Sequence, residues 1–564
     1  MLAAMPDFKF TNIQSYTNKK PRVDDKMIRK VPTHKIPHKF NHCIAAWDIE
    51  TTKDPDMNHI PYACSIAWME GIMQVEQQFW GLDCLTQFLK FLYKDNKFKG
   101  YTLYAHNGGK YDINLLMKFA LMGQNLWEIN GSKCIELNNS WIGFELQEKN
   151  EILELDERGK TMARHTIKFK DSMRILPMGL EKLCIELDVE HKKLTETVSH
   201  DDITLENYDT FPAMKTYLSH DVRGLLEVML TFNKSVFDDL KIDVTTCFTG
   251  ASLSKSTFYR NYYNSNKTPV YTLSDAHDKF IRDGYFGGRV ECFKMGKIEG
   301  AYYYDFTSLY PDVGRQHLPY GKPVEVDFKG ASHIPHTEGE EYFFGFVKCL
   351  VRTKDTTAIP KHAVLMNDRL TFPIFKKWTP LQCFSQEIDY DIYEYIFEAG
   401  LGFQKRCFMC KFFTDGFQKK AEAKADGQPA MAQAHKIIIN SGYGFWGLRT
   451  QDRDGVIICD KNNGDYLEYL NSERLVNMRE NEDGSLFCRV LKNLKVTDFN
   501  VGIASAISSY ARLKLHSLLT DIRAVGGDVY YCDTDSVICN INLNDHPELK
   551  EKHQWDGDGT ELGL

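Results

Sequence analysis

The spacing of apolar and polar residues predicts a chain that mixes short strands with amphipathic helices. Apolar residues that recur every three or four positions predict helices at 82–93, 111–121, 214–233, 412–440 and 504–518. Short apolar runs and alternation predict strands at 43–47, 134–170 and 300–304. The remaining long segments are mixed and turn-rich at 330–410 and polar and strand-like at 448–500. No internal repeat is present, so the pattern predicts several different cores.

Length and composition indicate a folded protein of several domains. At ~150 residues per domain, 564 residues predict about four domains, too many for a small disulfide scaffold. The formal net charge of −8 does not by itself indicate a nucleic-acid partner, so evidence for such a partner has to come from individual segments of the chain. Residues 1–40 differ in charge from the rest of the chain, because they contain nine Lys and Arg residues and only three Asp. They form either a draped tail or an arm that contacts phosphate or directs targeting.

The cysteines indicate a reducing compartment. Their number, fifteen, is odd and they are scattered, which does not fit a disulfide framework. Cys407 and Cys410 form one close pair, but no second CxxC lies nearby, so we expect buried free thiols there rather than a structural zinc site. His34, His38 and His42 lie among prolines and suit a solvated arm better than a metal site. The sequence contains neither a membrane-spanning run nor a secretory signal, so we expect an intracellular protein without a membrane partner.

A first group of carboxylates follows the apolar strand at 43–47. Asp48 and Glu50 are two positions apart, so in a strand both side chains point to the same face. Neighbouring carboxylates repel unless a divalent cation lies between them. Three later residues extend the group: Asp112, Tyr217 and Asp221. Tyr217 lies one helical turn before Asp221, where its hydroxyl could orient a water bound to a metal.

The order D-x-E, N-x3-Y-D and Y-x3-D resembles the three motifs of 3′–5′ proofreading exonucleases with an RNase H-like core. The resemblance implies two metal ions, activated water and a neutralised leaving oxygen. It assigns the metals to Asp48, Glu50, Asp112 and Asp221, and the water to Tyr217. It assigns the single-stranded 3′ end to Thr51, His106, Asn107, Tyr111, Ser172 and Met173. Met173 stands where these enzymes usually have leucine, a change that conserves volume.

A second group of carboxylates lies at predicted strand ends in the other half of the chain. Tyr302–Tyr304 runs into Asp305, and residues 529–537 read as a hairpin with Asp533 and Asp535 at its tip. Between them, three polar residues lie at i, i+4 and i+7 of a predicted helix: Lys436, Asn440 and Tyr443. A stripe of cation, amide and aromatic ring suits a nucleotide.

These segments resemble motifs A (D-x-x-S-L-Y-P), B (K-x3-N-S-x-Y-G) and C (Y-x-D-T-D-S) of family B DNA polymerases. The resemblance implies that Asp305 and Asp535 hold two Mg²⁺ ions, with Mn²⁺ as an alternative, supported by Asp533. Lys436 would neutralise the leaving pyrophosphate, and Tyr310 would exclude a 2′-OH. The other nucleotide contacts implied are Ser308, Leu309, Lys424, Asn440, Tyr443 and Gly444. The implied DNA contacts are Tyr285, Gly287, Gly288 and Thr534.

The arrangement of segments resembles the protein-primed branch of this family, found in phages, adenoviruses and linear plasmids. The signs are the Y-x-G-G element at 285–288, the compact core and two extra segments between the motifs. The resemblance implies an RNase H-like exonuclease followed by a right-hand polymerase, together α/β and α+β. The expected divisions are a basic arm 1–40, an exonuclease 41–240 and a polymerase 241–564. Within the last we expect palm at about 285–330 and 500–540, first insert 330–410, fingers 411–447 and second insert 448–500.

The resemblance implies template and primer DNA, dNTPs and a terminal priming protein as partners. In this branch the first insert grips the priming protein and template duplex, and the second gives strand displacement and processivity. The sequence reaches only 29 residues beyond Asp535, without the thumb and its K-x-Y motif, so we expect a truncated C-terminus. Two alternatives stay open: a family B enzyme with a nucleic-acid primer, and a truncated, non-catalytic DNA-binding derivative. Localisation would be host cytoplasm or nucleus for a virus, and mitochondrion for an organellar plasmid.

Overall fold

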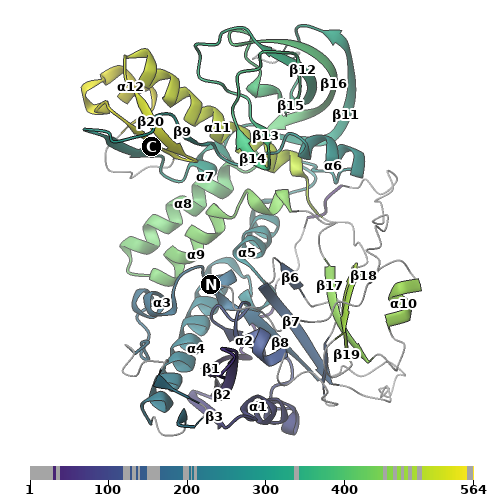
Figure 1. The fold of residues 1–564 in the computed structure, drawn as a ribbon, viewed down its shortest axis with the longest axis vertical. Coiled ribbons are helices and arrows are strands. Elements are labelled where there is room, and N and C mark those ends of the chain that lie inside the picture. Colours follow the sequence, from purple (N-terminus) through teal and green to yellow (C-terminus); the bar gives the residue numbers. More distant parts are fainter. Residues whose placement is uncertain are drawn as a thin grey trace.

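A computed structural model describes most of the chain (Figure 1). The described residues are 30–33, 38–117, 127–129, 135–137, 140–148, 165–194, 202–204, 206–208, 212–335, 342–448, 454–460, 466–471, 475–480, 485–491, 498–555 and 563. Most of the basic arm, including His34, lies outside them. Residues 462–464 and 483–484, whose Asn, Asp and Gly predict turns, also lie outside them. No helix in the described part is both long and apolar enough to span a membrane.

The N-terminal half forms around an eight-stranded sheet. The strand order is β3-β2-β1-β4-β8-β7-β5, with β6 paired to β7; β1 runs parallel to β4, and β4 to β8. The strands are β1 Ile44–Lys53, β2 His59–Glu70, β3 Met73–Trp80, β4 Thr102–Ala105, β5 Trp127–Ile129, β6 Ile135–Leu137, β7 Ser140–Glu148 and β8 Thr166–Asp171. The helices are α1 Cys84–Tyr93, α2 Asp112–Leu116, α3 Leu180–Glu186 and α4 Pro212–Leu240. Residues 118–121 of the expected 111–121 helix lie outside the description.

Alternation along β1 fills two separate cores, one on each face of the sheet. Trp47 points to the α1 side, where its ring stacks on Phe88 with centroids 5.6 Å apart. Ala46 points to the other side, where α4 packs. β1 continues beyond the apolar run through the predicted carboxylates, so Asp48 and Glu50 are held inside a paired strand rather than at its frayed end.

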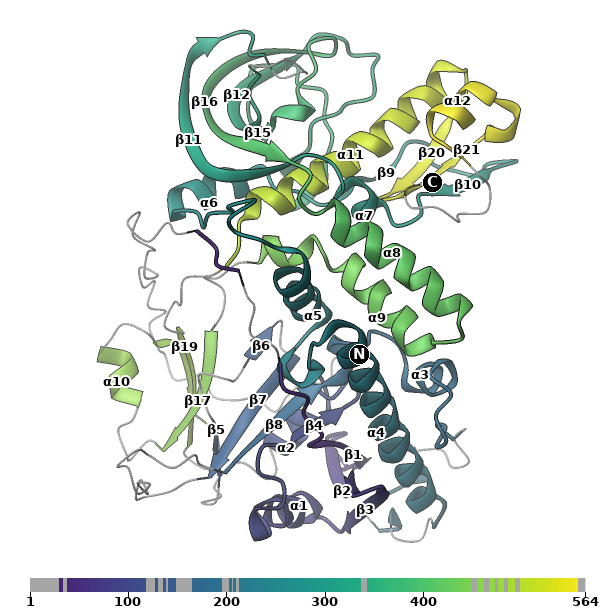
Figure 2. The same cartoon turned by 180° about the vertical axis from the view of Figure 1, so that it is seen from behind.

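A four-stranded sheet of order β10-β21-β20-β9 lies where the sequence predicts the palm, and the buried helix α11 packs behind it (Figure 2). These strands are β9 Val290–Cys292, β10 Tyr302–Asp305, β20 Val529–Asp533 and β21 Ser536–Cys539. The other helices of this half include α6 Asp275–Arg282, α7 Leu309–Val313, α11 Val501–Ala524 and α12 Pro547–Lys552, while α5 Gly250–Thr257 packs against α9 (Pro429–Asn440). The predicted hairpin at 529–537 is confirmed, with Thr534 in the left-handed conformation at its turn (φ 58°).

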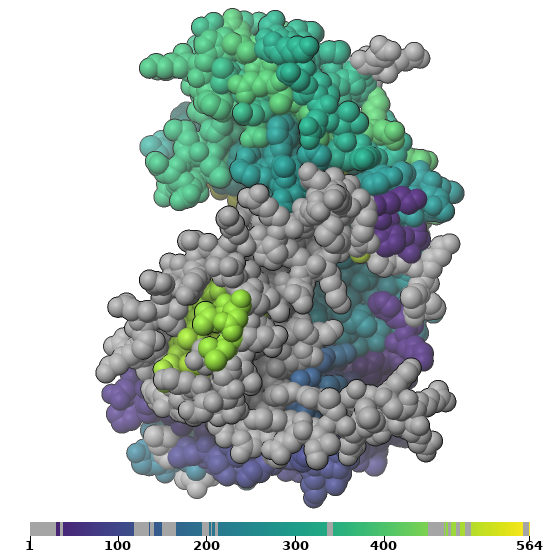
Figure 3. Space-filling view, turned by 90° about the vertical axis from the view of Figure 1, so that its right-hand side faces the viewer, coloured from purple at the N-terminus to yellow at the C-terminus, as the bar shows by residue number. Residues whose placement is uncertain are grey.

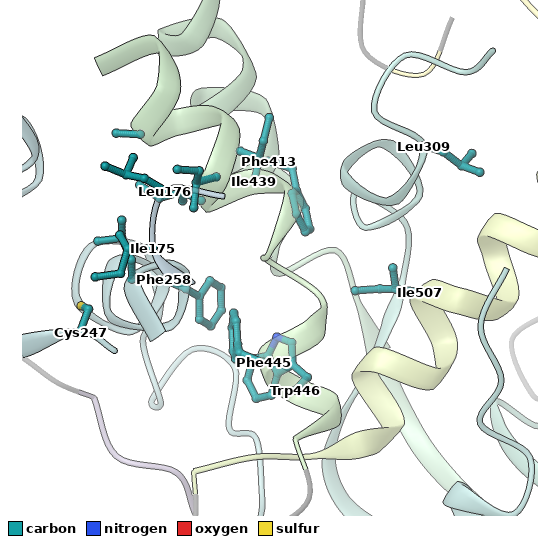
Figure 4. Packing of buried hydrophobic residues seen from close by; sticks show 14 of the residues in the cluster. Ile175, Leu176, Cys247, Phe258, Leu309, Phe413, Ile439, Phe445, Trp446 and Ile507 are labelled. Carbon is teal, nitrogen blue, oxygen red and sulfur yellow. The ribbon is translucent and has the colours of Figure 1, made fainter. Parts of the chain in front are cut away.

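The segment expected to form the fingers is the antiparallel pair α8 Cys410–Ala425 and α9 Pro429–Asn440. Gly427 and Pro429 predict an interruption of the expected 412–440 helix, and the structure confirms it. Gly416 lets the helices approach closely, because a Cβ there would lie 2.4 Å from Ile439 Cγ2. One apolar core joins the N-terminal sheet, the helices α8 and α9 and the β10-β21-β20-β9 sheet, and Figure 4 shows part of it. In that view Ile175 and Leu176 of the N-terminal half lie near α8 and α9, and Phe445 and Trp446 lie beside Phe258. The two halves therefore share a hydrophobic interface.

The segment between β10 and α8 is richer in long strands than its turn-rich sequence suggested. Its sheet has the order β11-β16-β12-β15, next to the hairpin β13-β14. The strands are β11 Leu318–Ala331, β12 Gly345–Thr353, β13 Val364–Met366, β14 Arg369–Thr371, β15 Thr379–Phe384 and β16 Tyr393–Arg406. In the second insert, the expected strands are β17 Asp454–Asp460, β18 Leu475–Glu480 and β19 Ser485–Leu491, with a helix α10 Tyr466–Asn471. The lime patch in Figure 3 is a described part of this insert.

Candidate active sites

The first carboxylate group converges from three elements, as predicted. β1 supplies Asp48 and Glu50, the first turn of α2 supplies Asp112, and α4 supplies Asp221. Asp112 accepts a hydrogen bond from the backbone N–H of Ile49 at 3.2 Å, which fixes α2 against β1. Burial, followed by repulsion from its acidic neighbours, raises the pKa of Asp48 well above its ordinary value. Burial also raises the pKa of Asp112, to about 7.

This environment fits divalent cations. Glu50, Asp112 and Asp221 are 6%, 3% and 5% exposed, yet they line a cleft of about 850 Å³ that opens to solvent. Mg²⁺ and Mn²⁺ prefer oxygen ligands such as carboxylates. Here several carboxylates lie close together although they repel one another, and a bound cation would offset that repulsion. Bound cations would lower the pKa of each carboxyl by offsetting the repulsion.

Lys193 also belongs to this site, although the sequence did not single it out. Its Nζ donates to Asp221 Oδ2 at 2.8 Å and lies 5.1 Å from the centroid of the Tyr217 ring. The acidic partner raises the pKa of Lys193, which keeps this ammonium charged. Lys193 lies in an irregular segment after α3, and a lone lysine in such a segment resembles a surface residue. The predicted Tyr217 lies in the same cleft.

Four of the six residues expected to hold the single strand line the cleft: Thr51, His106, Asn107 and Tyr111. Thr51 and Tyr111 hydrogen-bond to each other through their hydroxyls, and His59 Nδ1 lies 3.0 Å and 2.8 Å from these two oxygens. His106 hydrogen-bonds to the Met178 carbonyl at 2.8 Å and to Ser172 Oγ at 3.0 Å. Since burial lowers the pKa of His106 to about 4, its ring is neutral at physiological pH. His59 was not predicted, and its contacts place it with Thr51 and Tyr111.

The loop carrying Asn107 is held by a buried carboxylate. Asn107 is left-handed (φ 61°), and the Gly109 N–H donates to Asp171 Oδ2 at 3.3 Å. A Cβ on Gly109 would lie 2.0 Å from the Trp141 carbonyl oxygen, so the loop requires glycine there. Asp171 also accepts from the N–H of Met173 at 3.0 Å. It thereby joins the two segments that the sequence assigned to single-stranded DNA.

The second carboxylate group meets at the edge of the palm sheet. Asp305 ends β10 opposite Ser536, and the N–H of Phe306 donates to the Asp535 carbonyl at 2.8 Å. Burial raises the pKa of both Asp305 and Asp535, and Asp305 and Asp533 raise that of Asp535 further. This repulsion again fits a site for divalent cations.

The glycine segment at 285–289 packs directly against the motif C turn. The Thr534 N–H donates to the Arg289 carbonyl at 2.7 Å, and a Cβ on Gly288 would lie 2.7 Å from Thr534 Cγ2. A Cβ on Gly287 would meet no atom within 4 Å, so Gly287 borders open space. Tyr285 lies against Gly447, because a Cβ added to Gly447 would lie 2.6 Å from the Tyr285 hydroxyl oxygen. The structure thus brings all four predicted DNA contacts of the polymerase half to one place.

The predicted nucleotide residues come from α7 and the fingers. Ser308 is left-handed (φ 56°) and starts α7 with Leu309 and Tyr310. The Tyr310 and Tyr443 rings stack, with centroids 4.2 Å apart and planes 7° apart. One expectation was wrong: α9 ends at Asn440, so Tyr443 is not on the helix with Lys436. It lies in the turn that follows, before the 3-10 helix Gly444–Gly447, and this turn lets its ring reach Tyr310.

Three lysines lie near one another on the fingers. Lys436 and Lys424, both predicted, are exposed, and Asn440 is exposed one turn after Lys436. Lys420, which the sequence did not single out, is half-buried; burial, Lys436 and Lys424 lower its pKa. Mutual repulsion among unneutralised ammonium groups is the environment expected of an anion site.

Arg512 of α11 is a second residue missed from the sequence. Its guanidinium donates to the carbonyls of Phe286 and Gly287 at 2.8 and 3.0 Å and pairs with Glu387 at 2.6 Å. Both side chains of the pair are 4% exposed. A single arginine within a predicted apolar helix was the available signal. Arg512 supports the 285–289 segment from behind.

Comparison with known proteins identifies the family. The family model described as DNA polymerase type B, organellar and viral, matches residues 185–524. The chain belongs to this family. The resemblance to its protein-primed branch is therefore confirmed.

Relatives of this family member come from phage and fungi. The DNA-directed DNA polymerase of Enterobacteria phage PRD1 is 27% identical over 529 residues, covering 93% of this chain and 81% of that protein. A probable DNA polymerase of Agaricus bitorquis is 24% identical, covering 82% and 63%. A probable DNA polymerase of Podospora anserina is 23% identical, covering 92% and 50%. The chain thus spans between half and two thirds of the length of these fungal relatives.

The solved structure of phi29 DNA polymerase with primer-template DNA and incoming nucleotide has a similar fold. Its TM-score is 0.67 at 18% identity, covering 93% of this chain and 84% of that one. This likeness confirms the predicted fold class, an exonuclease domain followed by a polymerase domain. The domain boundaries and the roles of individual residues stay predictions.

Proposed function

We propose that the chain is a DNA-directed DNA polymerase with 3′–5′ proofreading exonuclease activity. The observation that carries this proposal is the pair of separate carboxylate sites, each built on its own sheet. Either site alone would suit many phosphate-transferring enzymes. Two such sites in a chain of this family suit synthesis at one and removal of mismatched ends at the other.

At the polymerase site, Asp305 and Asp535 would hold two Mg²⁺ ions, with Mn²⁺ as an alternative. Bound there, the ions would activate the primer 3′-OH and neutralise charge on the phosphates. The lysines of α8 and α9 would bind the triphosphate, and Lys436 would offset charge on the departing pyrophosphate. The stacked rings of Tyr310 and Tyr443 form a flat apolar surface that supports the sugar and base of the incoming dNTP.

At the exonuclease site, Asp48, Glu50, Asp112 and Asp221 would hold two ions of the same kind. These ions would supply an activated water and a neutralised leaving oxygen. Lys193 donates a hydrogen bond to Asp221, and its charge lies beside Tyr217, which would orient the attacking water. The Thr51, Tyr111 and His59 cluster would hold the terminal nucleotide of the single strand.

We further propose that synthesis begins on a protein hydroxyl. Family membership supports this, because the chain falls in the protein-primed branch. The partners would be template and primer DNA, dNTPs and a terminal protein. The thirteen free cysteines among the described residues support a reducing compartment: host cytoplasm or nucleus, or mitochondrion. A nucleic-acid primer is the alternative.

The test separates the two sites. Asp535→Ala should abolish dNTP addition and retain digestion of a single-stranded 3′ end, and Asp48→Ala should do the reverse. Equal loss of both activities in both variants would contradict two independent sites. Transfer of labelled deoxynucleotide to a Ser, Thr or Tyr of a candidate terminal protein tests the priming mode. Extension of DNA primers with no protein labelling would favour the nucleic-acid-primed alternative.

A further inference from the structure

The palm sheet carries a second row of side chains beside its carboxylates. Strand register places Asp305 opposite Ser536, and Ser536 opposite Asp533. Two residues further from the carboxylates on each strand, Tyr303 lies opposite Ile538, and Ile538 opposite Tyr531. Because residues i and i+2 share a face, the aromatic row and the carboxylate row point the same way.

Exposure confirms which face this is. Tyr303 is 63% exposed, whereas its neighbour Tyr304 is 7% exposed and packs edge-on against Trp555 on the opposite side of the sheet. Tyr302 stacks on Tyr304 and so belongs to that opposite side. On the exposed face, the Tyr531 hydroxyl donates to Asp533 Oδ2 at 3.4 Å. The row therefore continues the surface that holds the carboxylates.

The row lies on the side of the carboxylates away from the groups proposed to bind dNTP. The groups proposed to bind dNTP follow Asp305 in the chain: Tyr310 on α7, which packs against α9 (Figure 2). Tyr303 precedes Asp305, on the side of the strand away from α7. Two residues of strand span about 6.7 Å, close to the rise of two nucleotides along one DNA strand.

We propose that Tyr303, with Ile538 and Tyr531, positions the last nucleotides of the primer strand; this rests on the proposed polymerase function. The Tyr303 ring packs against deoxyribose, and its hydroxyl donates to a phosphate oxygen. Such contacts are independent of sequence, as a replication enzyme requires. Tyr303 contacts neither dNTP nor metal, so it is a positioning residue.

The test measures the primer and the dNTP separately. In the full chain, Tyr303→Ala should weaken binding of recessed primer-template DNA, followed by fluorescence anisotropy, about tenfold, or roughly 1.4 kcal/mol. In extension assays it should raise the KM for primer by a similar factor and leave the KM for dNTP unchanged. Tyr303→Phe keeps the ring and should lose less than Tyr303→Ala. Because a primer 3′ end that is held less tightly separates from the template more often, the Tyr303→Ala enzyme should also digest matched primers faster than wild type.

Tyr302→Ala is the matched control, since it removes the same side chain from the same strand on the opposite face. Wild-type primer binding by Tyr303→Ala, or equal losses in both alanine variants, would overturn the proposal. A change confined to dNTP KM, or to initiation on a protein, would also overturn it. If the wild-type chain binds primer-template but never extends it, the polymerase function fails while the anisotropy comparison still decides the role of Tyr303.

Discussion

Lys193 lies outside every sequence motif, yet we expect the exonuclease site to depend on its charge. It is the cation that contacts Asp221, so Lys193→Ala leaves a carboxylate that is 5% exposed without this partner. We expect exonuclease activity to fall about 100-fold, the scale seen when a group stabilising charge is removed. Polymerisation should be unchanged, because the palm site is separate.

The neighbouring Lys192→Ala provides the control for this prediction, since Lys192 is 52% exposed and pairs with Asp188. Digestion of a labelled single strand, compared with primer extension by the same preparations, is the measurement. If Lys192→Ala lost as much digestion as Lys193→Ala, the segment as a whole rather than the Lys193 charge would matter.

Lys170 makes a prediction about pH. Its Nζ is buried and donates to the carbonyls of Thr245 and Cys247 at 2.6 and 2.8 Å. Burial lowers its pKa from 10.5 to about 7, so between pH 7 and 10 the unfolded chain binds more protons at this lysine than the folded chain. Its contribution to stability therefore rises with pH across that window and is smallest below pH 7.

Chemical denaturation of wild type and Lys170→Met from pH 7 to 10 checks this sign. The wild-type free energy of unfolding should increase relative to that of the variant as pH rises. Lys168→Met, two residues earlier on β8, is the control and should show no such trend. A wild-type free energy of unfolding that does not increase relative to that of Lys170→Met would mean that Lys170 stays charged in the fold.

At the scale of elements, local pattern predicted the long helices and the two strands that lead to carboxylates, but it missed short helices such as α3, α5 and α6 and the long strands of the first insert. The apolar run before Asp48 is short, buried and paired, whereas the run before Asp305 is short and paired but exposed at Tyr302 and Tyr303. In the first insert, β11 and β16 are 14 residues each, but bulges break their alternation and glycines such as Gly400 and Gly402 interrupt the apolar signal. Tyr443 was misplaced because the end of α9 depends on packing: a Cβ on Gly442 would lie 2.7 Å from Phe412 and Phe413.

The close contact between α8 and α9 predicts a fingers variant. Gly416→Ala places a methyl 2.4 Å from Ile439 Cγ2, which forces the helices apart. We expect a loss of about 1–3 kcal/mol in unfolding free energy, as in other overpacked cores, and a raised KM for dNTP because Lys436 moves with α9. Ala421→Leu, on the exposed face of α8, is the control. Unchanged stability and dNTP affinity in Gly416→Ala would show that the hairpin adjusts without cost.

At the scale of the molecule, the net charge of −8 does not oppose DNA binding, because charge is distributed unevenly. Carboxylates concentrate at two sites where cations would offset them, while lysines gather on the fingers. The sequence located both sites, because their carboxylates recur at fixed spacings. It could not show that Arg512 and Glu387, 125 residues apart, meet in the interior, since neither belongs to a local pattern.

The Arg512–Glu387 pair joins three parts of the molecule: α11, the first insert and the 285–289 segment. Removing one partner leaves an unpaired buried charge, so Glu387→Leu should cost about 3–5 kcal/mol of unfolding free energy. The double variant Glu387→Leu/Arg512→Met removes both charges and should recover part of that loss. It should still extend primers poorly, because the carbonyls of Phe286 and Gly287 lose their donor. Denaturation and primer extension on the single and double variants separate these effects; a double variant with wild-type extension would show that Arg512 serves stability alone.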